Sequence, residues 1–418
     1  MKVFDFRKTA TIWTLLLLGA SGGYPLGALT YAATYHVSAN GDDSNPGTEV
    51  TPWKTVQKAA AVLQPGDTVL IHDGTYSGTV RPAVSGTSNA WITYKAYPGH
   101  HPVLTSSENI TFHIAGKSYI EVNGLTITGT HPYGTGIEPD GPAHHIRILS
   151  NIVRDNGESG IGTGAGADYL FIEGNTIHGN CRTSPVWQGS GISLWQLGWY
   201  DNAPGVHNVI QRNRIYDNRL DAAGTHTDAN GIIIDVSGNN PPVRIENNVI
   251  FNNGGRCINI FKSGNTTISS NTCYMNNADP AVNDGEIFAN QSVNVTAYNN
   301  LVYSRSGIPT TASYNSSQLS FDYNLSFNGP VNERGPHDIV IDPKLVNPAI
   351  DPGTADVRLR EDSPAVDRGT PSGAPGIDFE GNPRPVGEGF DIGAYEYNGA
   401  NPTSRRPDSP RNLQVTFP

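Results

Sequence analysis

The chain has 418 residues, of which 47 are glycine and 30 are proline, and only 16% are charged. This composition suits many short strands joined by tight turns, and it excludes a helical bundle or a disordered chain. The formal net charge of −11 makes nucleic acid an unsuitable partner, because a phosphate backbone repels an acidic protein. A polyanionic polysaccharide would bind only where cations gather locally.

The N-terminus predicts a secretory signal peptide over residues 1–33. Lys2, Arg7 and Lys8 precede the apolar run TIWTLLLLGA, and the small residue Ala32 suits a cleavage site. A membrane anchor is the alternative, although the run is shorter than the roughly 20 residues that a spanning helix needs. No other segment of the sequence could span a bilayer, so we expect no membrane span after cleavage. The signal peptide predicts a secreted or cell-surface bacterial protein, and we expect it to be a monomer.

The segment after the signal peptide predicts an N-terminal cap. VQKAAAVL, which starts at Val56, has helical spacing, and Pro65-Gly66 ends the helix. TVLIHDGTY, which starts at Thr68, then alternates as a strand. A short amphipathic helix at this point would cover the open end of a stacked repeat.

A short phrase recurs along the middle of the chain and predicts a solenoid. Each copy runs from alternating apolar residues into an asparagine, an apolar pair and a polar turn, as in YLFIEGNTIHGN and VRIENNVIFNNGG. Such a period with β-rich content indicates a β-helix, in which side-chain amides stack along the axis. The recurring asparagines stand 23 to 38 residues apart, at Asn151, Asn175, Asn213, Asn248, Asn271 and Asn300.

Each repeat divides into three predicted strands, one before the asparagine, one after it and a third that starts near a glycine. The loop that enters the third strand is short in NGGRC but long in NCRTSPVWQGSG and NRLDAAGTHTDANG. Insertions in a solenoid gather on one face, which is often the binding face. We therefore expect a cleft on the third-strand face beneath the long loops.

These coils, together with the opening HVSANGDDSNPGTEVTPWKTVQKAA and QPGDTVLIHDGTY, resemble the pectate-lyase-like right-handed parallel β-helix superfamily over roughly residues 35–330. The resemblance implies an all-β, single-stranded right-handed parallel β-helix over 34–340 with a short N-terminal capping helix. Residues 363–397 resemble a terminal module of bacterial surface β-helix proteins, so 341–400 are expected to cap the C-terminal edge. Residues 401–418 resemble a linker or tail.

The long loop before one third strand supplies candidate metal ligands. In THTDANGIIID, Ile232 and Ile234 should face the core, so Asp235 should face outward. Together with Asp228 and Asp221, it can offer hard oxygen ligands to Ca²⁺. The alternative is that these aspartates cap turns.

The following coil supplies candidate bases. Arg256 lies at a loop–strand junction, whereas Lys262 has inward parity, so the strand must bend there to release its ammonium group to solvent. The superfamily resemblance implies β-elimination on a uronate, in which Ca²⁺ is held by acidic or amide side chains. A Lys or Arg on a neighbouring coil then takes the proton. His226 is a further candidate acid or base.

Aromatic side chains in the coil before Asp235 predict a sugar-binding platform, because exposed rings stack on sugar faces. The alternative is that these rings pack their loop onto the solenoid. Three outward-facing polar residues of other coils complete the predicted set, and Glu138 among them would extend the cleft. The residues expected to bind substrate are Trp187, Trp195, Trp199, Tyr200, Asn259, Glu286 and Glu138.

We therefore expect a Ca²⁺-assisted polysaccharide lyase. The first alternative is a glycoside hydrolase that uses Asp235 with Asp228 or Glu286 as its carboxylate pair. The second is a non-catalytic glycan-binding protein or adhesin. The three cysteines leave a Cys257–Cys273 bridge and buried free thiols both open, with Cys181 as the third.

Overall fold

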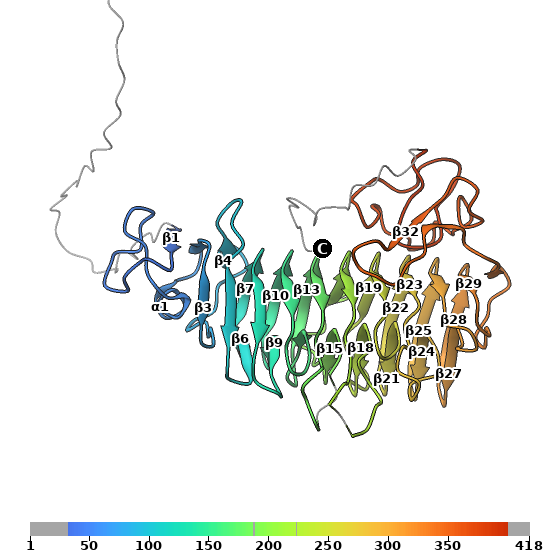
Figure 1. The fold of residues 1–418 in the computed structure, drawn as a ribbon, viewed down its shortest axis with the longest axis horizontal. Helices are drawn as coiled ribbons and strands as arrows, with labels where there is room; N and C mark the ends of the chain where they lie inside the picture. The colour runs from blue at the N-terminus through green and yellow to red at the C-terminus, as the bar shows by residue number, and fades with distance from the viewer. Residues whose placement is uncertain (1–31, 187–188, 223, 400–418) are drawn as a thin grey trace, which may run out of the picture. The chain divides into compact units, whose positions relative to one another are not determined.

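The computed structural model describes residues 32–186, 189–222 and 224–399. The predicted signal peptide up to residue 31 and the tail 401–418 lie outside the described residues. Three parallel sheets run along the solenoid, as predicted from the three strands of each repeat (Figure 1). We name them sheets A, B and C.

Sheet A contains the strand that precedes the asparagine of each coil. Its strands are β1 (Thr34–Val37), β2 (Thr68–Ile71), β4 (Ile92–Ala96), β7 (Ser118–Asn123), β10 (His144–Leu149), β13 (Asp168–Glu173), β16 (Asn208–Gln211), β19 (Val243–Glu246), β22 (Gly264–Ser269), β25 (Val293–Tyr298) and β28 (Ser317–Asp322).

Sheet B contains the strand that follows the asparagine. Its strands are β3 (Thr75–Ser77), β5 (Val103–Ser106), β8 (Thr126–Gly129), β11 (Ile152–Arg154), β14 (Thr176–His178), β17 (Arg214–Tyr216), β20 (Val249–Phe251), β23 (Thr272–Tyr274), β26 (Leu301–Tyr303), β29 (Leu325–Phe327) and β30 (Ile339–Val340).

Sheet C contains the third strand of each coil and carries the predicted site. Its strands are β6 (Ile110–Ala115), β9 (Thr135–Asp140), β12 (Ile161–Gly162), β15 (Ile192–Trp195), β18 (Ile232–Asp235), β21 (Ile258–Phe261), β24 (Ile287–Asn290) and β27 (Thr311–Tyr314). Two further strands, β31 (Leu345–Asn347) and β32 (Asp356–Leu359), form an antiparallel pair after the solenoid.

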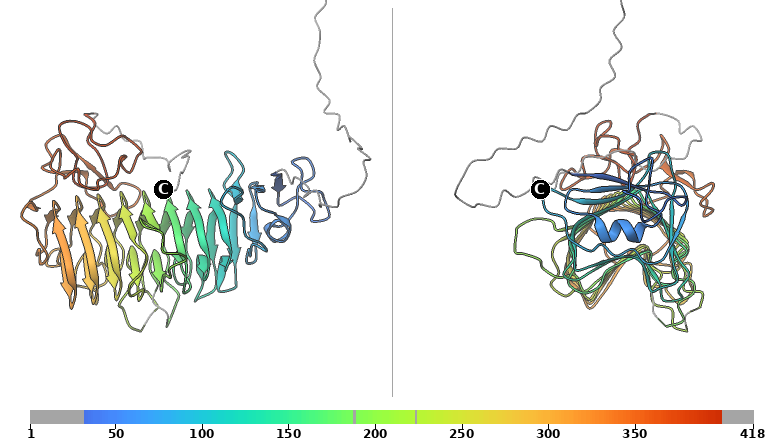
Figure 2. Two further views of the ribbon diagram at one scale, coloured as in Figure 1. Left: turned by 180° about the vertical axis from the view of Figure 1, so that it is seen from behind. Right: turned by 90° about the vertical axis from the view of Figure 1, so that its left-hand side faces the viewer.

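The predicted capping helix is α1 (Val56–Val62), which lies across the N-terminal end of the coils (Figure 2). It begins at Thr55, whose side chain accepts a hydrogen bond from the backbone N–H of Lys58. Its buried face joins the main core, so the helix covers apolar surface that the first coil would otherwise expose. Among the described residues, no helix is long and apolar enough to cross a membrane.

The interior of the solenoid consists of stacked apolar columns. In sheet C, isoleucines of five consecutive strands lie in register, and each is fully buried or nearly so. Burying one such side chain contributes roughly 1.5–3 kcal/mol, so the repeated column is a large part of the stabilisation. Its members are Ile161, Ile192, Ile232, Ile258 and Ile287.

The predicted asparagine ladder runs along the turn between sheets A and B. Each side-chain amide donates from Nδ2 to the Oδ1 of the asparagine in the next coil, over 2.9–3.1 Å from Asn151 to Asn324. Every member also accepts the backbone N–H of its predecessor, as Asn271 does for Asn248. The buried amides are therefore satisfied only while the coils keep one register.

A second ladder, which we did not predict from the sequence, runs along the turn after sheet B. Its members stand five residues after those of the first ladder, and their amides are 2.8–2.9 Å apart. This constant spacing is visible in the repeated phrase and would have revealed the ladder. The members are Asn156, Asn180, Asn218, Asn253 and Asn276.

Glu286 ends the second ladder inside the solenoid, so the expectation that it faces a cleft is wrong. The next ladder position holds Arg305, which has no acceptor to offer. Glu286 instead accepts the backbone N–H and the Nδ2 of Asn276, both over 2.9 Å. Its side chain is fully buried, and burial raises its pKa to about 8.

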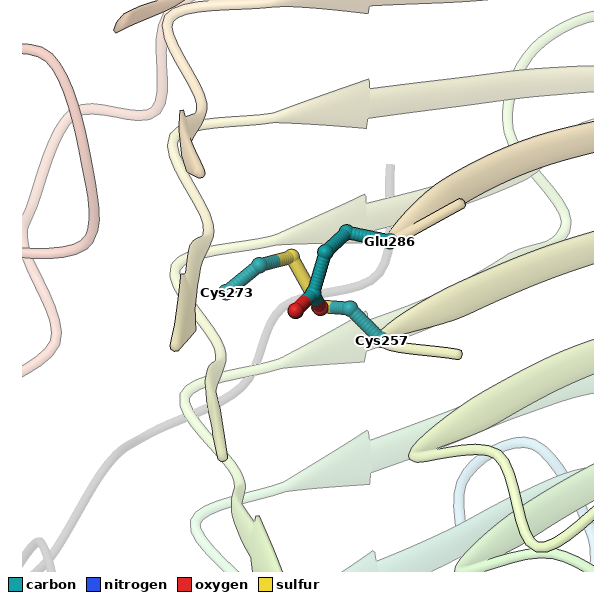
Figure 3. A group of neighbouring side chains, drawn as sticks. All are labelled: Cys257, Cys273 and Glu286. Carbon is teal, nitrogen blue, oxygen red and sulfur yellow. A yellow bond between two sulfur atoms is a disulfide. The ribbon is translucent and has the colours of Figure 1, made fainter. Parts of the chain in front are cut away.

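The Cys257–Cys273 bridge forms beside Glu286, with the two Cα atoms 5.7 Å apart (Figure 3). It joins the start of the third strand of one coil to the second strand of the next coil. The sequence left this bridge and buried free thiols both open. The structure has the bridge, and Cys181 is a buried free thiol.

The C-terminal module packs along the outer face of sheet B, over several successive strands and not only over the C-terminal edge as expected. Its apolar residues form one core with Phe251, Tyr274 and Leu301 of sheet B. Polar contacts add to this packing, because the Nη2 of Arg384 donates to the Oδ1 of Asn247 over 3.2 Å. The reason for this position is that sheet B presents large apolar side chains outward, which must be covered.

Replacing one ladder asparagine should destabilise the protein. Asn271→Ala removes an amide that bonds both neighbouring coils, and it leaves buried donors and acceptors unpaired. We expect a loss of about 2–4 kcal/mol, read from the shift of the urea unfolding midpoint. Asn290→Ala, at the half-buried end of β24, is the matched control and should shift the midpoint little. Equal shifts for the two variants would contradict a special role for the ladder.

Glu286 should make stability depend on pH. Because its pKa is raised from 4.5 to about 8, the folded state holds a proton that the unfolded chain releases between these values. Its contribution is therefore complete below about pH 4.5 and is lost as the pH rises through about 8. Glu286→Gln cannot titrate, so its unfolding free energy should fall less than that of the wild type over this window. Parallel pH curves for the two proteins would refute this assignment.

Candidate active face on sheet C

Sheet C brings predicted site residues of different coils into one outward column. Trp195 pairs in register with Asp235, and Asp235 pairs with Phe261 of the next coil. Paired residues of neighbouring strands lie about 4.8 Å apart in this direction. Trp195 is 39% exposed and Asp235 is half-buried, so an indole and a carboxylate stand side by side on the surface. We call this outward side of sheet C the active face.

A second outward column of sheet C is covered. Ile233, Asn259 and Phe288 occupy consecutive strands in register, and each is at most 5% exposed. The expectation that Asn259 contacts substrate is therefore wrong for this conformation, although its outward parity was right. Parity places a side chain on a face of the sheet, but it does not reveal which loops cover that face.

The negative charge of Asp235 acts on the carboxyl group of Asp228. Asp228 lies in the long loop that enters β18, and Asp235 ends the same strand. Burial raises the pKa of Asp228 to about 7, and the negative charge of Asp235 raises it further than the neighbouring Arg256 lowers it. Burial also raises the pKa of Asp235, to about 6. Near neutral pH the pair can therefore hold one carboxylic acid beside one carboxylate.

Arg256 connects the loops of the active face. Its Nη1 donates to the backbone oxygen of Thr227 over 2.7 Å, and its Nη2 forms an ion pair with Asp284. The side chain is 7% exposed, and the guanidinium lies 5.2 Å from the centre of the Phe288 ring. A protonated arginine held in this way suits a positioning residue better than a base, because it fixes the residue that precedes Asp228.

Lys262 is exposed at the point where its strand bends. Its φ of 46° is in the left-handed region, which confirms the predicted bend at the end of β21. The ammonium lies 4.9 Å from the centre of the Phe261 ring, and its charge partly offsets the rise in the pKa of Asp235. Lys262 is thus a solvent-accessible cation beside Asp235.

Asp221 and His226, from the same long loop, bind other partners. Asp221 forms an ion pair with Arg182, and His226 pairs with Asp279 of a later loop. These contacts join the long loops to each other and to the following coil. Their roles as a metal ligand and as an acid or base stay predictions, and these ion pairs do not support them.

The three aspartates do not form a ready-made Ca²⁺ site. Within the described part of the chain, two groups of three potential ligand residues have ligand atoms within 4.8 Å of one another. Neither group includes Asp221, Asp228 or Asp235. Asp221 is paired with a cation, and Asp228 accepts a hydrogen bond from Asn230, so the set does not offer the several oxygens that Ca²⁺ takes.

Two of the predicted platform residues lie beyond the end of β15 and pack against the solenoid. The Tyr200 ring stacks on His144 with centroids 3.6 Å apart, and Trp199 meets His207 edge-on at 5.2 Å. Trp199 also donates from its indole nitrogen to the backbone oxygen of Asn239. Both rings nevertheless stay exposed, at 42% for Trp199 and 51% for Tyr200, so their role in sugar binding stays a prediction, whereas Trp187 lies outside the described residues.

Residues 35–192 match the family model of the Pel9A-like right-handed β-helix region. This match agrees, over that part of the chain, with the predicted resemblance to the pectate-lyase-like right-handed parallel β-helix superfamily. The all-β, right-handed parallel β-helix fold is thereby confirmed.

Similarity to individual proteins within and beyond this superfamily is low. The chain is 32% identical over 131 residues to the uncharacterized protein YwoF of Bacillus subtilis, and the match spans 28% of each chain. A structure of XylC in complex with xylose has a TM-score of 0.56 and 14% identity, covering 87% of this chain and 98% of that one. The structure of pectate lyase Pel9A has a TM-score of 0.52 and 19% identity, covering 89% and 98%. At these identities the likeness shows the fold alone.

The structure adds two acidic residues that we did not predict from the sequence. Glu158 lies three residues before β12 of an earlier coil, and burial together with the charge of Glu138 raises its pKa to about 7. Asp284 holds Arg256. Like Asp228, both precede a third strand. An acidic residue shortly before the third strand recurs in several coils, and this pattern in the sequence could have revealed both residues.

Removing the charge of Asp235 should lower the pKa of Asp228. The carboxylate of Asp235 disfavours ionisation of Asp228, so Asp235→Asn should shift the Asp228 titration to lower pH. The shift is measured by NMR titration of the side-chain carboxyl carbons. Asp362→Asn, at an exposed site in the C-terminal module, is the matched control. An unchanged Asp228 titration in Asp235→Asn would mean that the two carboxylates are not coupled.

Proposed function

We propose that this chain is a glycan-cleaving enzyme and that Asp228 and Asp235 are the acid–base pair of a glycoside hydrolase. The observation that carries the proposal is the interacting pair itself, with pKa values raised to about 7 and about 6. Hydrolysis of a glycosidic bond needs one protonated carboxylic acid and one ionised carboxylate. In this assignment Asp228 protonates the leaving oxygen, and Asp235 acts as base or nucleophile.

The neighbouring side chains suit the binding of a sugar ring. Trp195 pairs in register with Asp235 and offers an exposed indole on which a sugar face can stack. Arg256 holds the loop that carries Asp228, so the acid is positioned relative to the strand that carries Asp235. Among solved structures of similar fold, XylC was determined in complex with xylose, and another protein is named a glycoside hydrolase.

The charge of the active face favours a neutral glycan over a uronate. Glu138, Glu158, Asp228 and Asp235 all lie on sheet C or in the loops that enter it. Of the four, Asp235 has the lowest raised pKa, about 6, so near neutral pH it carries a negative charge that would repel a polyanion unless Lys262 or a bound cation neutralised it. Hydrolysis therefore ranks ahead of the lyase reaction, which came first in the expectation from the sequence.

The second candidate is β-elimination on a uronate with Lys262 as the base. Two observations favour it: the match of residues 35–192 to a Pel9A-like region, and the exposed ammonium beside Asp235. A cation bound at the aspartates would stabilise the negative charge on the substrate carboxylate. Asp221, Asp228 and Asp235 do not lie together as a set of ligands, so the structure gives no support for Ca²⁺ binding there. The dependence of the reaction on Ca²⁺ stays a prediction.

We also propose that the protein acts outside the cell. The Cys257–Cys273 disulfide supports this location, because such bridges persist in oxidising compartments. A polysaccharide as partner is consistent with that setting.

A glycan panel with two readouts separates the candidates. Hydrolysis gives new reducing ends without ultraviolet absorbance, whereas elimination gives reducing ends together with absorbing unsaturated ends. For hydrolysis we expect Asp228→Asn and Asp235→Asn each to lower kcat about 10²–10⁴-fold. Asp362→Asn is the control and should be fully active. Full activity in either active-face variant would refute the assignment, and binding without cleavage on every glycan would support an adhesin.

The pH profile of the wild type gives a separate test. Activity should be highest between about pH 6 and 7, because Asp235 gains a proton below this range and Asp228 loses one above it. Asp228→Asn should abolish the alkaline limb of the residual activity. Activity that instead kept rising above about pH 8 would indicate a basic residue such as Lys262.

A further inference from the structure

A histidine and two carboxylates converge on the active face near its N-terminal end. His113 of β6 pairs in register with Glu138 of β9, and Asp140 follows two residues later on the same outward side. One ligand atom from each residue lies within 4.8 Å of those from the other two. The Nε2 of His113 is 3.6 Å from the Oδ2 of Asp140.

The imidazole of His113 makes no hydrogen bond of normal length, and its nearest polar contact is the 3.6 Å approach to Asp140. Both of its ring nitrogens are buried. A buried polar atom left unpaired costs roughly 1–3 kcal/mol, so such a group calls for an explanation.

The next strand leaves room for the Asp140 carboxylate. Because Ile137 pairs with Ile161, Glu138 lies opposite Gly162, and Asp140 lies opposite Gly164. A Cβ atom at position 164 would come within 2.0 Å of the Oδ1 of Asp140. The φ of Gly164 lies outside the left-handed region, so the close approach of Asp140 is the reason that this position needs glycine.

We propose that His113, Glu138 and Asp140 bind a divalent transition-metal cation of the Zn²⁺ type. One imidazole nitrogen and two carboxylate oxygens are ligands that Zn²⁺ takes, and three protein ligands leave a coordination position open. Ligand atoms around Zn²⁺ stand about 3.4 Å apart for bonds of about 2.1 Å. The three groups therefore need only a small adjustment. Ca²⁺ fits less well, because it takes six to eight oxygen ligands.

Both a negatively and a positively charged side chain lie near the site. Glu158 adds negative charge beside Glu138, whereas Arg81 acts on His113 with a positive charge. Two carboxyl groups among the ligands and a third nearby would each ionise more readily beside a bound dication, which favours such an ion at the site. The site is three strands from Asp235, or roughly 14 Å along the sheet, so it is separate from the proposed acid–base pair.

The test is calorimetric titration of the mature chain with Zn²⁺ at about pH 7, with no affinity tag. We expect one site per chain in the wild type, and at least tenfold weaker binding in His113→Phe and in Glu138→Gln. His113→Phe removes a proposed ligand without removing a hydrogen bond of normal length, so it separates metal binding from folding. Its melting temperature without metal should equal or exceed that of the wild type. Added Zn²⁺ should raise the melting temperature of the wild type only.

Two further variants complete the design. Gly164→Ala should weaken binding by displacing the Asp140 carboxylate while leaving all three ligands in place. His337→Gln is the matched control, because His337 pairs with Asp322 at an exposed position and could bind Zn²⁺ adventitiously. Absence of binding in the wild type, or unchanged affinity in His113→Phe with loss in His337→Gln, would overturn the proposal. Because glycan cleavage is not the readout, failure here leaves the proposed function untouched.

Discussion

The structure depends on hydrogen bonds between side-chain amides of successive coils. In each ladder an asparagine donates to the next asparagine and accepts from the previous one, so every buried amide requires its neighbours in one register. A slip of one residue would move every side chain of a strand to the opposite face. The ladders therefore determine which residues of distant coils become neighbours, both in the core and on the active face.

A ladder of this kind needs a partner at its last asparagine, and a carboxylate provides it. The first ladder ends at Asp338, which accepts from the backbone and side chain of Asn324. The second ends at Glu286, which accepts from Asn276 in the same way. The oxygens of a carboxyl group accept both donors of the last asparagine, so the chain of donors can stop there. A buried acid with a raised pKa thus has a structural explanation at Glu286, and its pKa alone does not indicate catalysis.

On the active face, register and loops act together. Register sets Trp195 beside Asp235, and the long loop before β18 adds Asp228 to the same region. Arg256 is the residue that connects these parts, because it binds the loop before its own coil and the acidic residue before the next strand of sheet C. The proposed acid–base pair and the proposed cation site both use this face, at positions several strands apart.

The sequence alone determined the β-helix, its capping helix, the first ladder and the face to which Asp235 and Trp195 point, because these follow from period and alternation. The tertiary structure alone decided which side chains are paired or covered. Arg256 meets Asp284 28 residues later, and His226 meets Asp279 53 residues later. Glu286 turns inward at a corner, where strand alternation no longer applies. Such contacts depend on loop conformation and on the stacking of coils, and neither has a periodic signal in the chain.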